Sequence, residues 1–406
     1  MRRGESGSLG SLRRSNRARV VGALSALGQS SRAGVARETG LSRTTVSSIV
    51  SELQDEGLVV EVGENGTAPA SSGGRPPTLI SLDPSAGLAA GIDFGKTHVS
   101  VAVADLAHNV LSEARRELDE QTPATVAMAA ADELFGTVLD EADADRARVV
   151  GVGMGLPGPI HRSGLVGSSA ILPGWVGVSA EADMEARLRL PVRVRNDADL
   201  GALAEHRWGA GRGCSSMAYL KLATGVGAGL IMHSRLWGGE GGTAGEIGHT
   251  TIDETGQICR CGNRGCLETF VGAPAIVEPL AQRLGDDLAV ERVIELAQEG
   301  DPGCRRVLED AGRRTGIAVA NLCNLFNPAR IVVGGTVGTA GELILAPLRD
   351  AVRLRAIPSA AEDVEIVSGE LGERAELLGA VALVLQEASL AVPGLESGRT
   401  SGKQVS

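Results

Sequence analysis

The sequence predicts a short helical domain followed by a longer body of the α/β class. Three observations support this prediction. The chain has 406 residues, 43% of them hydrophobic, which is too many for one ordinary core. Residues 63–77 (GENGTAPASSGGRPP) have a composition typical of a connection between domains. Beyond them, apolar strand patterns alternate with helical ones. We therefore expect several domains.

Both ends of the chain are rich in Gly, Ser and charged residues. Such segments bury too little apolar surface to offset the entropy lost on ordering, so we predict a disordered head over 1–14 and a disordered tail over 391–406. No run approaches the roughly 18 to 20 apolar residues of a membrane span, and no signal-peptide core follows the first arginines. We expect a cytoplasmic protein with no membrane partner.

The formal charge of −11 alone argues against binding to nucleic acid, but the charge is unevenly distributed. Residues 1–51 contain nine arginines and two glutamates, which gives this stretch a charge of +7. A basic head on an acidic body can approach DNA in one orientation only. The head is therefore the candidate DNA-binding part.

Three helical segments between Ser15 and Glu56 are separated by turn signals. Ser15, Ser31 and Ser42 can each cap a helix, and Gly40 and Gly57 can end the second and third. In the third segment apolar residues recur at helical spacing and predict a buried stripe of Val46, Ile49, Val50 and Leu53. With strands expected at 58–62 and 78–82, residues 15–82 are predicted to form a winged helix-turn-helix.

The opposite face of the third helix carries an arginine and short hydroxyl side chains, which fit a DNA major groove. The predicted DNA contacts in the helices are Arg17, Arg32, Ser42, Arg43, Thr44, Thr45, Ser47 and Ser48. Arg75, between Gly74 and Pro76 on the wing, could enter a minor groove. Two alternatives stay open: the helical unit could serve packing or dimerisation, and Arg75 could be a solvated loop residue.

One histidine and three cysteines cluster in a loop punctuated by glycines (CRCGNRGC). His249, Cys259, Cys261 and Cys266 would satisfy tetrahedral zinc with no open position, so we predict a structural Zn²⁺. The alternative is a set of reduced cysteines without metal. The other cysteines are expected to be ordinary buried residues.

Six motifs in the body resemble the ROK family of repressors, open reading frames and sugar kinases, in particular its regulators. They are DFGKT (93–97), GLPGP (155–159), NDA (196–198), TGVGAG (224–229), AGEIGH (244–249) and the CxCGxxGCxE run that ends at Glu268. The most specific of them is GEIGH followed by CxCGxxGCxE. The resemblance extends from the helix-turn-helix to about Glu387.

The resemblance implies an actin-like (ribonuclease H-like) sugar kinase fold, in which two α/β lobes enclose a cleft. We expect the first lobe over 83–205 and the second, with the zinc loop, over 206–390; whether the C-terminal helix returns to the first lobe stays open. By the same resemblance, sugar hydroxyls would contact Asn196, Asp197, Glu246, His249 and Glu268. His249 would reach sugar and zinc through its two ring nitrogens.

In the family's kinases, the residue that matches Asp197 is the general base. A kinase would also bind ATP and Mg²⁺, and the matching nucleotide residues are Asp93, Gly95, Thr97, Thr224, Gly225, Gly334 and Gly335. Lys96 and Ala223 stand where those kinases have glycine, and their side chains would crowd the phosphates, although Lys96 could instead act as a counter-charge to a phosphate. Ile171 stands where sugar-binding members commonly have Asn, which favours an unusual ligand.

We therefore expect a sugar-responsive regulator, in its commoner form a repressor, of carbohydrate metabolism genes. Its partners would be operator DNA, a sugar or sugar phosphate effector, and further copies of the chain in a homodimer or homotetramer. Two alternatives stay open. One is an ATP-dependent hexose kinase similar to glucokinases, and the other is a zinc-stabilised scaffold without a ligand.

Overall fold

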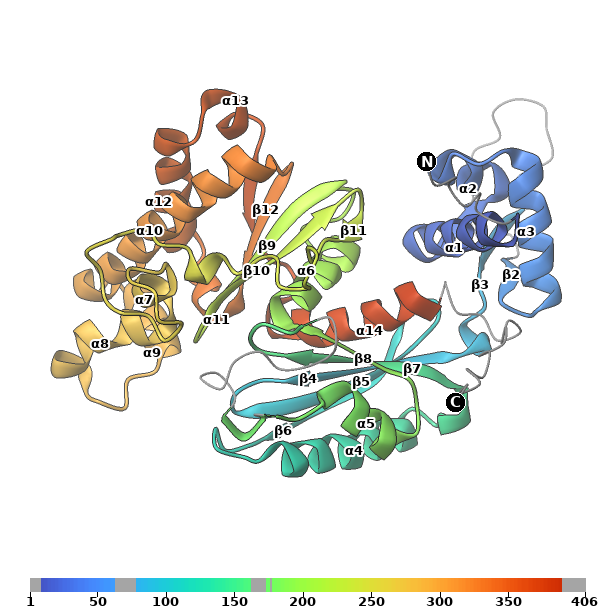
Figure 1. Cartoon of the computed structure of the whole chain (residues 1–406), viewed down its shortest axis with the longest axis horizontal. Helices are drawn as coiled ribbons and strands as arrows, with labels where there is room; N and C mark the ends of the chain where they lie inside the picture. Colours follow the sequence, from blue (N-terminus) through green and yellow to red (C-terminus); the bar gives the residue numbers. More distant parts are fainter. Residues whose placement is uncertain (1–8, 63–77, 162–172, 176, 389–406) are drawn as a thin grey trace, which may run out of the picture.

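The computed structural model describes residues 9–62, 78–161, 173–175 and 177–388, which form an N-terminal helical domain and two α/β lobes (Figure 1). The expected fold class is confirmed. Within the described residues no helix is both long and apolar enough to cross a bilayer.

The N-terminal domain contains three helices and a small sheet. The helices are α1 (Leu9–Leu27), α2 (Arg32–Thr39) and α3 (Arg43–Asp55). The antiparallel strands β1 (Gln29–Ser31), β3 (Leu79–Leu82) and β2 (Val59–Val62) follow in that order across the sheet. Two expected caps are confirmed, because Ser31 Oγ accepts from the Gly34 amide and Ser42 Oγ accepts from the Thr45 amide, each at 3.1 Å. The connection with Arg75 lies outside the described residues.

The first helix begins at Leu9, so the prediction of disorder was wrong for residues 9–14 and Ser15 does not cap this helix. Arg13 pairs with Glu52, and Arg17 pairs with Glu56. Both acids lie at the end of α3. These ion pairs hold the early turns of α1 against another helix, a tertiary contact that local composition does not reveal. Residues 1–8 and the tail 391–406 lie outside the described residues.

The first lobe is a five-stranded sheet in the order β6-β5-β4-β7-β8. Strands β4 (Leu88–Phe94), β5 (His98–Asp105) and β6 (Val110–Glu117) are antiparallel, while β7 (Val149–Leu156) and β8 (Val192–Asn196) run parallel to β4. Helices α4 (Ala124–Glu141) and α5 (Ala180–Leu188) share an apolar core with one face of this sheet.

The second lobe repeats this topology in the order β11-β10-β9-β12-β13. Its strands are β9 (Ser216–Leu222), β10 (Val226–Met232), β11 (Arg235–Leu236), β12 (Arg330–Gly334) and β13 (Glu365–Ser368). One face carries α7 (Glu268–Val271), α8 (Ala273–Leu284), α9 (Val290–Gln298), α10 (Pro302–Phe326) and α12 (Glu342–Arg355). The short helices α11 (Gly335–Gly338) and α13 (Pro358–Ala361) connect these elements. The two lobes therefore share one sheet topology.

Two helices lie between the sheets: α6 (Asp197–Trp208) and α14 (Ala375–Ala388). Helix α14 returns to the first lobe and packs on its sheet through Leu377 and Val381, which settles the question that the sequence left open. The expected lobe boundary between residues 205 and 206 falls inside α6, which packs on the second sheet as well as on α14. These two helices therefore connect the lobes.

Candidate functional site

The outer face of α3 is the candidate DNA-binding surface. Val46, Ile49, Val50 and Leu53 are at most 4% exposed, as the stripe predicted. Arg43, Thr44, Ser47 and Ser48 are exposed on the other side. Ser42 and Thr45 are engaged in the cap, and Ser48 Oγ donates to Glu52 at 3.1 Å. The exposed arginine and hydroxyl groups at the start of this helix therefore face outward together.

Two other predicted DNA contacts, Arg17 and Arg32, are bound inside the domain. Arg17 donates two hydrogen bonds to the Glu56 carboxylate, and these raise the pKa of Arg17 above its usual value. Arg32 donates to Gln54 at 2.9 Å and lies 3.4 Å from Glu61. Both guanidinium groups hold elements of the domain together, so contact with a phosphate would require a change of partner.

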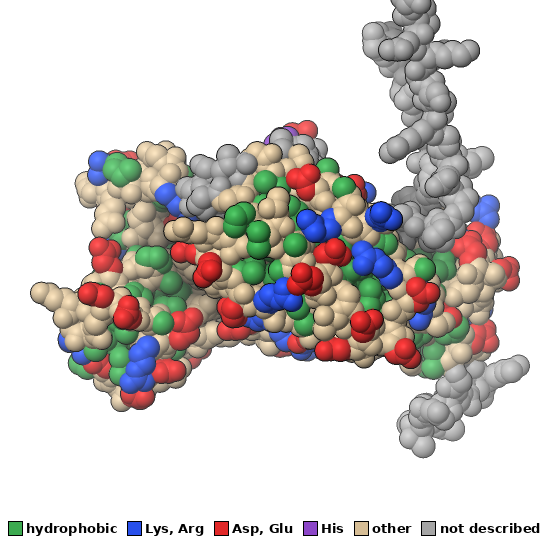
Figure 2. All heavy atoms as spheres, turned by 90° about the horizontal axis from the view of Figure 1, so that it is seen from below, with side chains coloured by type: hydrophobic (Ala, Val, Ile, Leu, Met, Phe, Trp, Pro, Cys, Tyr) green, Lys and Arg blue, Asp and Glu red, His purple; other side chains and the backbone are tan. Residues whose placement is uncertain are grey.

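The body presents mixed charge on the face drawn in Figure 2, where acidic and basic side chains are interspersed among hydrophobic ones. A phosphate backbone is bound by clustered positive charge, which this face does not offer. The face of the body drawn in this view therefore has no counterpart to the basic excess of residues 1–51.

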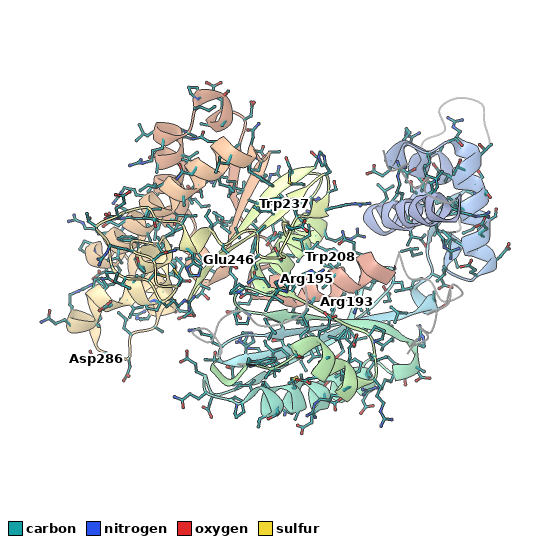
Figure 3. All side chains as sticks on the ribbon, viewed as in Figure 1. Arg193, Arg195, Trp208, Trp237, Glu246 and Asp286 are labelled. Carbon is teal, nitrogen blue, oxygen red and sulfur yellow. The ribbon has the colours of Figure 1, made fainter. Side chains whose placement is uncertain are left out.

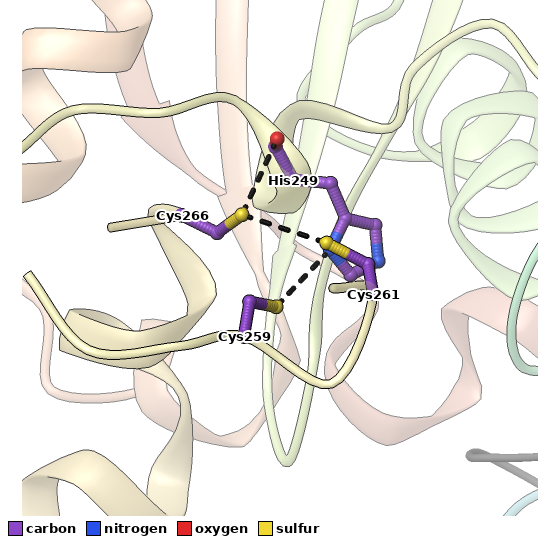
Figure 4. Close-up of side chains that lie close together, drawn as sticks. All are labelled: His249, Cys259, Cys261 and Cys266. Atoms are coloured by element: carbon purple, nitrogen blue, oxygen red, sulfur yellow. Dashed lines mark hydrogen bonds between the residues drawn. The ribbon is translucent and has the colours of Figure 1, made fainter. Parts of the chain in front are cut away.

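The four predicted metal ligands come together. The ligand atoms of His249, Cys259, Cys261 and Cys266 all lie within 4.8 Å of one another (Figure 4). Cys259 Sγ is 3.6 Å from His249 Nδ1, and Cys261 Sγ is 3.7 Å from Cys266 Sγ. Zinc–sulfur bonds of about 2.3 Å in a tetrahedron place ligand atoms roughly 3.5 to 3.8 Å apart. The donor set and its spacing fit a tetrahedral Zn²⁺.

His249 links this cluster to a second group of polar side chains. Its Nδ1 faces Cys259, whereas its Nε2 lies 3.9 Å from Oε2 of Glu246. Figure 3 shows Glu246 and Arg195 at the junction of the lobes. Glu246, directly before η4 (Ile247–His249), lies within electrostatic range of Asp197 at the start of α6 and of Glu268 in α7. We call this group the polar cluster: Asn196, Asp197, Glu246, His249 and Glu268.

Asn196 and Asp197 are positioned by the junction between β8 and α6. Asn196 caps α6, since its Oδ1 accepts from the Ala198 amide at 2.8 Å, and its Nδ2 donates to the Gly158 carbonyl at 2.7 Å. Asp197 Oδ1 also accepts from the Ala198 amide at 2.8 Å. Because a helix begins here, its amides hold both side chains at a fixed point between the lobes.

Glu246 and Glu268 differ in their partners. Glu268 Oε2 accepts from Arg260 at 2.7 Å and from the Val226 amide at 3.1 Å. For Glu246, burial raises the pKa above its usual value, and the carboxylates of Asp197 and Glu268 raise it further. The carboxylates of Asp197, Glu246 and Glu268 therefore lie near enough to interact, and carboxylate oxygens are acceptors for hydroxyl donors.

The residues matched to nucleotide-binding positions lie at strand ends. Asp93 lies near the end of β4, and its Oδ2 is 3.4 Å from Nε2 of His98. Gly95 and Thr97 lie in the turn that follows β4. Thr224 and Gly225 occupy the equivalent turn after β9. Gly335 follows β12 with φ at +77°, and a Cβ there would lie 2.4 Å from the Leu222 carbonyl oxygen. Backbone packing alone is sufficient to require glycine at Gly335.

Sequence reasoning missed several polar residues beside the polar cluster: Asp199, Tyr219, Lys221, Arg260 and Glu376. Lys221 interrupts the apolar strand β9, and Glu376 opens the apolar helix α14. A charged residue in an apolar strand or helix is a usable signal, because burying an unpaired charge is costly. Its partner, however, is not evident from sequence.

Comparison with known proteins places the chain in a family. The family model described as ROK family matches residues 89–387. The chain belongs to the ROK family. The xylose repressor of Caldicellulosiruptor bescii is 30% identical over 374 residues, which cover 88% of this chain and 92% of that protein. The DNA-binding transcriptional dual regulator NagC of Escherichia coli K12 is 29% identical over 392 residues, 93% of this chain and 94% of that protein.

Solved structures of ROK family proteins share the fold of this chain. A ROK family transcriptional regulator, a homolog of the E. coli MLC protein, superposes with a TM-score of 0.77 at 24% identity and covers 93% of this chain and 97% of its own. A ROK family glucokinase from Streptomyces griseus, in complex with glucose and AMPPNP, has a TM-score of 0.64 at 29% identity and covers 73% and 99%. Since the regulators match nearly the whole chain, it belongs with the transcriptional regulators of the family.

Proposed function

We propose that this regulator binds operator DNA through α3 and that a sugar bound at the polar cluster lowers its affinity for DNA. The observation that carries the proposal is the presence, in one chain, of an outward-facing arginine and hydroxyl surface on α3 and of paired carboxylate and amide groups between two lobes. The genes would be those of carbohydrate metabolism, as the names of the repressor relatives suggest.

The start of α3 supplies the DNA contacts in this proposal. Arg43 can reach a base edge or a phosphate, and the small hydroxyl groups of Thr44, Ser47 and Ser48 allow the helix to approach the groove closely. A homodimer or homotetramer would present two such helices to half-sites separated by about one or two helical turns. Arg75 would add a minor-groove contact from the wing.

The polar cluster supplies the sugar contacts. Asn196, Asp197, Glu246 and Glu268 offer acceptors, and Asn196 and His249 offer donors, so that adjacent hydroxyl groups can be bound in pairs. A Zn²⁺ held by His249 and the three cysteines would fix the imidazole so that Nε2 faces the sugar. The role proposed for the metal is structural.

In this proposal, helix α6 transmits the effect of sugar binding to the DNA-binding domain. Its first residue, Asp197, belongs to the polar cluster, while its body packs on both α14 and the second sheet. A sugar that draws the lobes together would move these helices and change the spacing of the paired DNA-binding domains. A coupling free energy of roughly 1 to 3 kcal/mol would change DNA affinity about 5- to 150-fold.

Fluorescence anisotropy on the DNA upstream of the chain's own gene tests the proposal. The purified full-length chain is titrated at fixed salt, because phosphate contacts dominate affinity, with D-xylose, N-acetylglucosamine, glucose and their phosphates. We expect specific binding that one sugar weakens. Absence of specific binding under every condition would overturn the proposal.

Substitution of Arg43 tests the surface of α3. Arg43→Ala should weaken operator binding by about 1 to 3 kcal/mol, which is roughly 5- to 150-fold. The control is Arg292→Ala on α9, where the arginine pairs with Glu295 on the surface of the second lobe. Unchanged operator affinity in Arg43→Ala would remove this residue from the interface.

A further inference from the structure

Lys221 occupies an unusual place at the end of β9. The chain has three lysines, and this one interrupts a strand of buried apolar residues. Its Nζ lies 2.9 Å from Asp197 Oδ2 and 3.2 Å from Glu376 Oε1. One ammonium group therefore joins β9 to the start of α6 and to the start of α14.

The surroundings of Lys221 keep it charged. Burial disfavours the ammonium form, but the carboxylates of Asp197, Glu376 and Asp93 outweigh this effect and raise the pKa of Lys221. Tyr219 donates a hydrogen bond of 3.3 Å to the same oxygen of Glu376. Lys221 is thus an ammonium group that is paired with Asp197 and Glu376 and lies in the field of the Asp93 carboxylate.

This arrangement bears on phosphoryl transfer. In phosphoryl-transfer sites, carboxylates hold divalent cations that neutralise the phosphate charge. A general base needs a lone pair directed at the attacking hydroxyl. In Asp197, Oδ1 accepts from the Ala198 amide and Oδ2 accepts from Lys221. Lys221 therefore affects both the binding of a divalent cation and the lone pairs that Asp197 can offer as a base.

We propose that Lys221 is a built-in counter-ion that replaces a divalent cation among Asp93, Asp197 and Glu376 and keeps Asp197 as an ion-paired carboxylate. The polar cluster can then bind a sugar without transferring a phosphoryl group to it. The sugar in this statement rests on the proposed function, whereas the counter-ion role rests on the ion pairs alone.

Lys221 is a positioning residue in this proposal, and a purely structural ion pair would also stabilise the fold. The two roles differ in one measurable property. If the ammonium replaces a cation, its removal creates an oxygen-rich site of three uncompensated carboxylates. A structural pair, once removed, leaves only a less stable protein.

Binding of Mn²⁺ separates the two roles. Mn²⁺ prefers oxygen ligands to thiolates, and its electron paramagnetic resonance signal falls when the hydrated ion is bound. The full-length chain is titrated as wild type, Lys221→Ala, Lys221→Arg and Lys96→Ala. Lys96→Ala is the matched control, because it also removes an ammonium beside a carboxylate, that of Glu120 at 3.3 Å, outside the cluster.

We expect Lys221→Ala to bind one Mn²⁺ per chain at least tenfold more tightly than the wild type. Lys221→Arg and Lys96→Ala should resemble the wild type, and adding Asp197→Asn to Lys221→Ala should abolish the gain. If Lys221→Ala is poorly folded, thermal melting in millimolar Mn²⁺ replaces the titration. Mn²⁺ should then raise its melting temperature and leave that of the wild type unchanged.

Two results would overturn the proposal. One is wild-type protein that binds Mn²⁺ as tightly as Lys221→Ala, and the other is a Lys221→Ala chain that shows neither a gain in binding nor stabilisation by Mn²⁺. Neither result involves operator DNA or a sugar. Failure of the counter-ion role is therefore distinguishable from failure of the proposed function.

Discussion

Asp199 lies in the first turn of α6 with only 3% of its surface exposed, and its Oδ1 has no hydrogen-bond partner among the described residues. Burial raises the pKa of this carboxyl to about 8, an effect that Arg195 opposes and the carboxylates of Asp197 and Glu246 reinforce. The group is therefore mainly protonated in the folded protein at neutral pH. It reduces the negative charge beside the polar cluster.

The raised pKa of Asp199 makes stability depend on pH. Between the ordinary value of 3.8 and the folded value of about 8, the folded chain binds a proton that the unfolded chain has lost. The free energy of unfolding should therefore fall as pH rises through this window, by up to about 1.4 kcal/mol per pH unit from this group. Asp199→Asn should remove the effect, so its melting temperature should exceed that of the wild type increasingly from pH 5 to pH 8.

The control for this measurement is Asp286→Asn, an exposed position far from the junction of the lobes (Figure 3). Its melting curves should follow those of the wild type at every pH. A constant difference between Asp199→Asn and the wild type across the pH range would refute the assignment of the pH dependence to this carboxyl.

At the scale of elements, the loop from Cys259 to Cys266 carries three of the four candidate metal ligands. It contains two glycines in the left-handed region, Gly262 at φ +92° and Gly265 at φ +64°, which turn the chain so that three thiols converge. The loop is joined to its lobe by the bridge between Thr251 and Cys266 and by Arg260, which donates to Glu268 at 2.7 Å. A bound Zn²⁺ would add a link among the three thiols and His249.

Loss of one ligand should release the metal. Cys259→Ser should lower zinc content, measured by plasma mass spectrometry, from about one ion per chain to a small fraction. Affinity should fall by more than the roughly 10- to 100-fold typical of losing a hydrogen-bonding partner of a ligand. Cys304→Ala is the control, since this cysteine is buried outside the cluster. Full zinc content in Cys259→Ser would exclude this thiol as a ligand.

Local signals predicted several elements and not others. Ser31 and Ser42 were identified as caps because capping depends on residues three apart, and the stripe on α3 was identified because it repeats every turn. Strand β1 was missed, since its three residues form a strand only by pairing with β3, about fifty residues later in the chain. Short strands are defined by such distant partners.

At the scale of the whole molecule, α6 and α14 pass between the two sheets in close contact. A Cβ placed on Gly379 of α14 would lie 1.9 Å from the Leu200 carbonyl oxygen of α6. The two helix backbones can approach this closely only because position 379 has no side chain. A side chain at position 379 would therefore force α6 and α14 apart.

A matched pair of glycine substitutions tests this contact. Gly379→Ala should destabilise the chain by several kcal/mol, because the methyl group has no space and backbone must shift. Gly136→Ala in α4 meets nothing within 4 Å and should be neutral or stabilising by up to about 1 kcal/mol. The comparison is made by urea denaturation. Equal stability of the two variants would show that the helices can separate without cost.

The sequence by itself predicted the helices and two of the strands of the N-terminal domain, the four residues of the candidate metal cluster and the motifs of the two-lobed body. These features depend on residues close together in the chain, and their spacing reflects the period of a helix or the geometry of a metal ion.

Only the tertiary structure decided the partners of the charged residues and the place of the last helix. Arg17 and Arg32 are bound within their domain, α14 returns to the first lobe, and Lys221 lies between Asp197 and Glu376. A buried charge must find an opposite charge, but the sequence does not specify which one. Packing makes that choice, because it brings together residues that are distant along the chain.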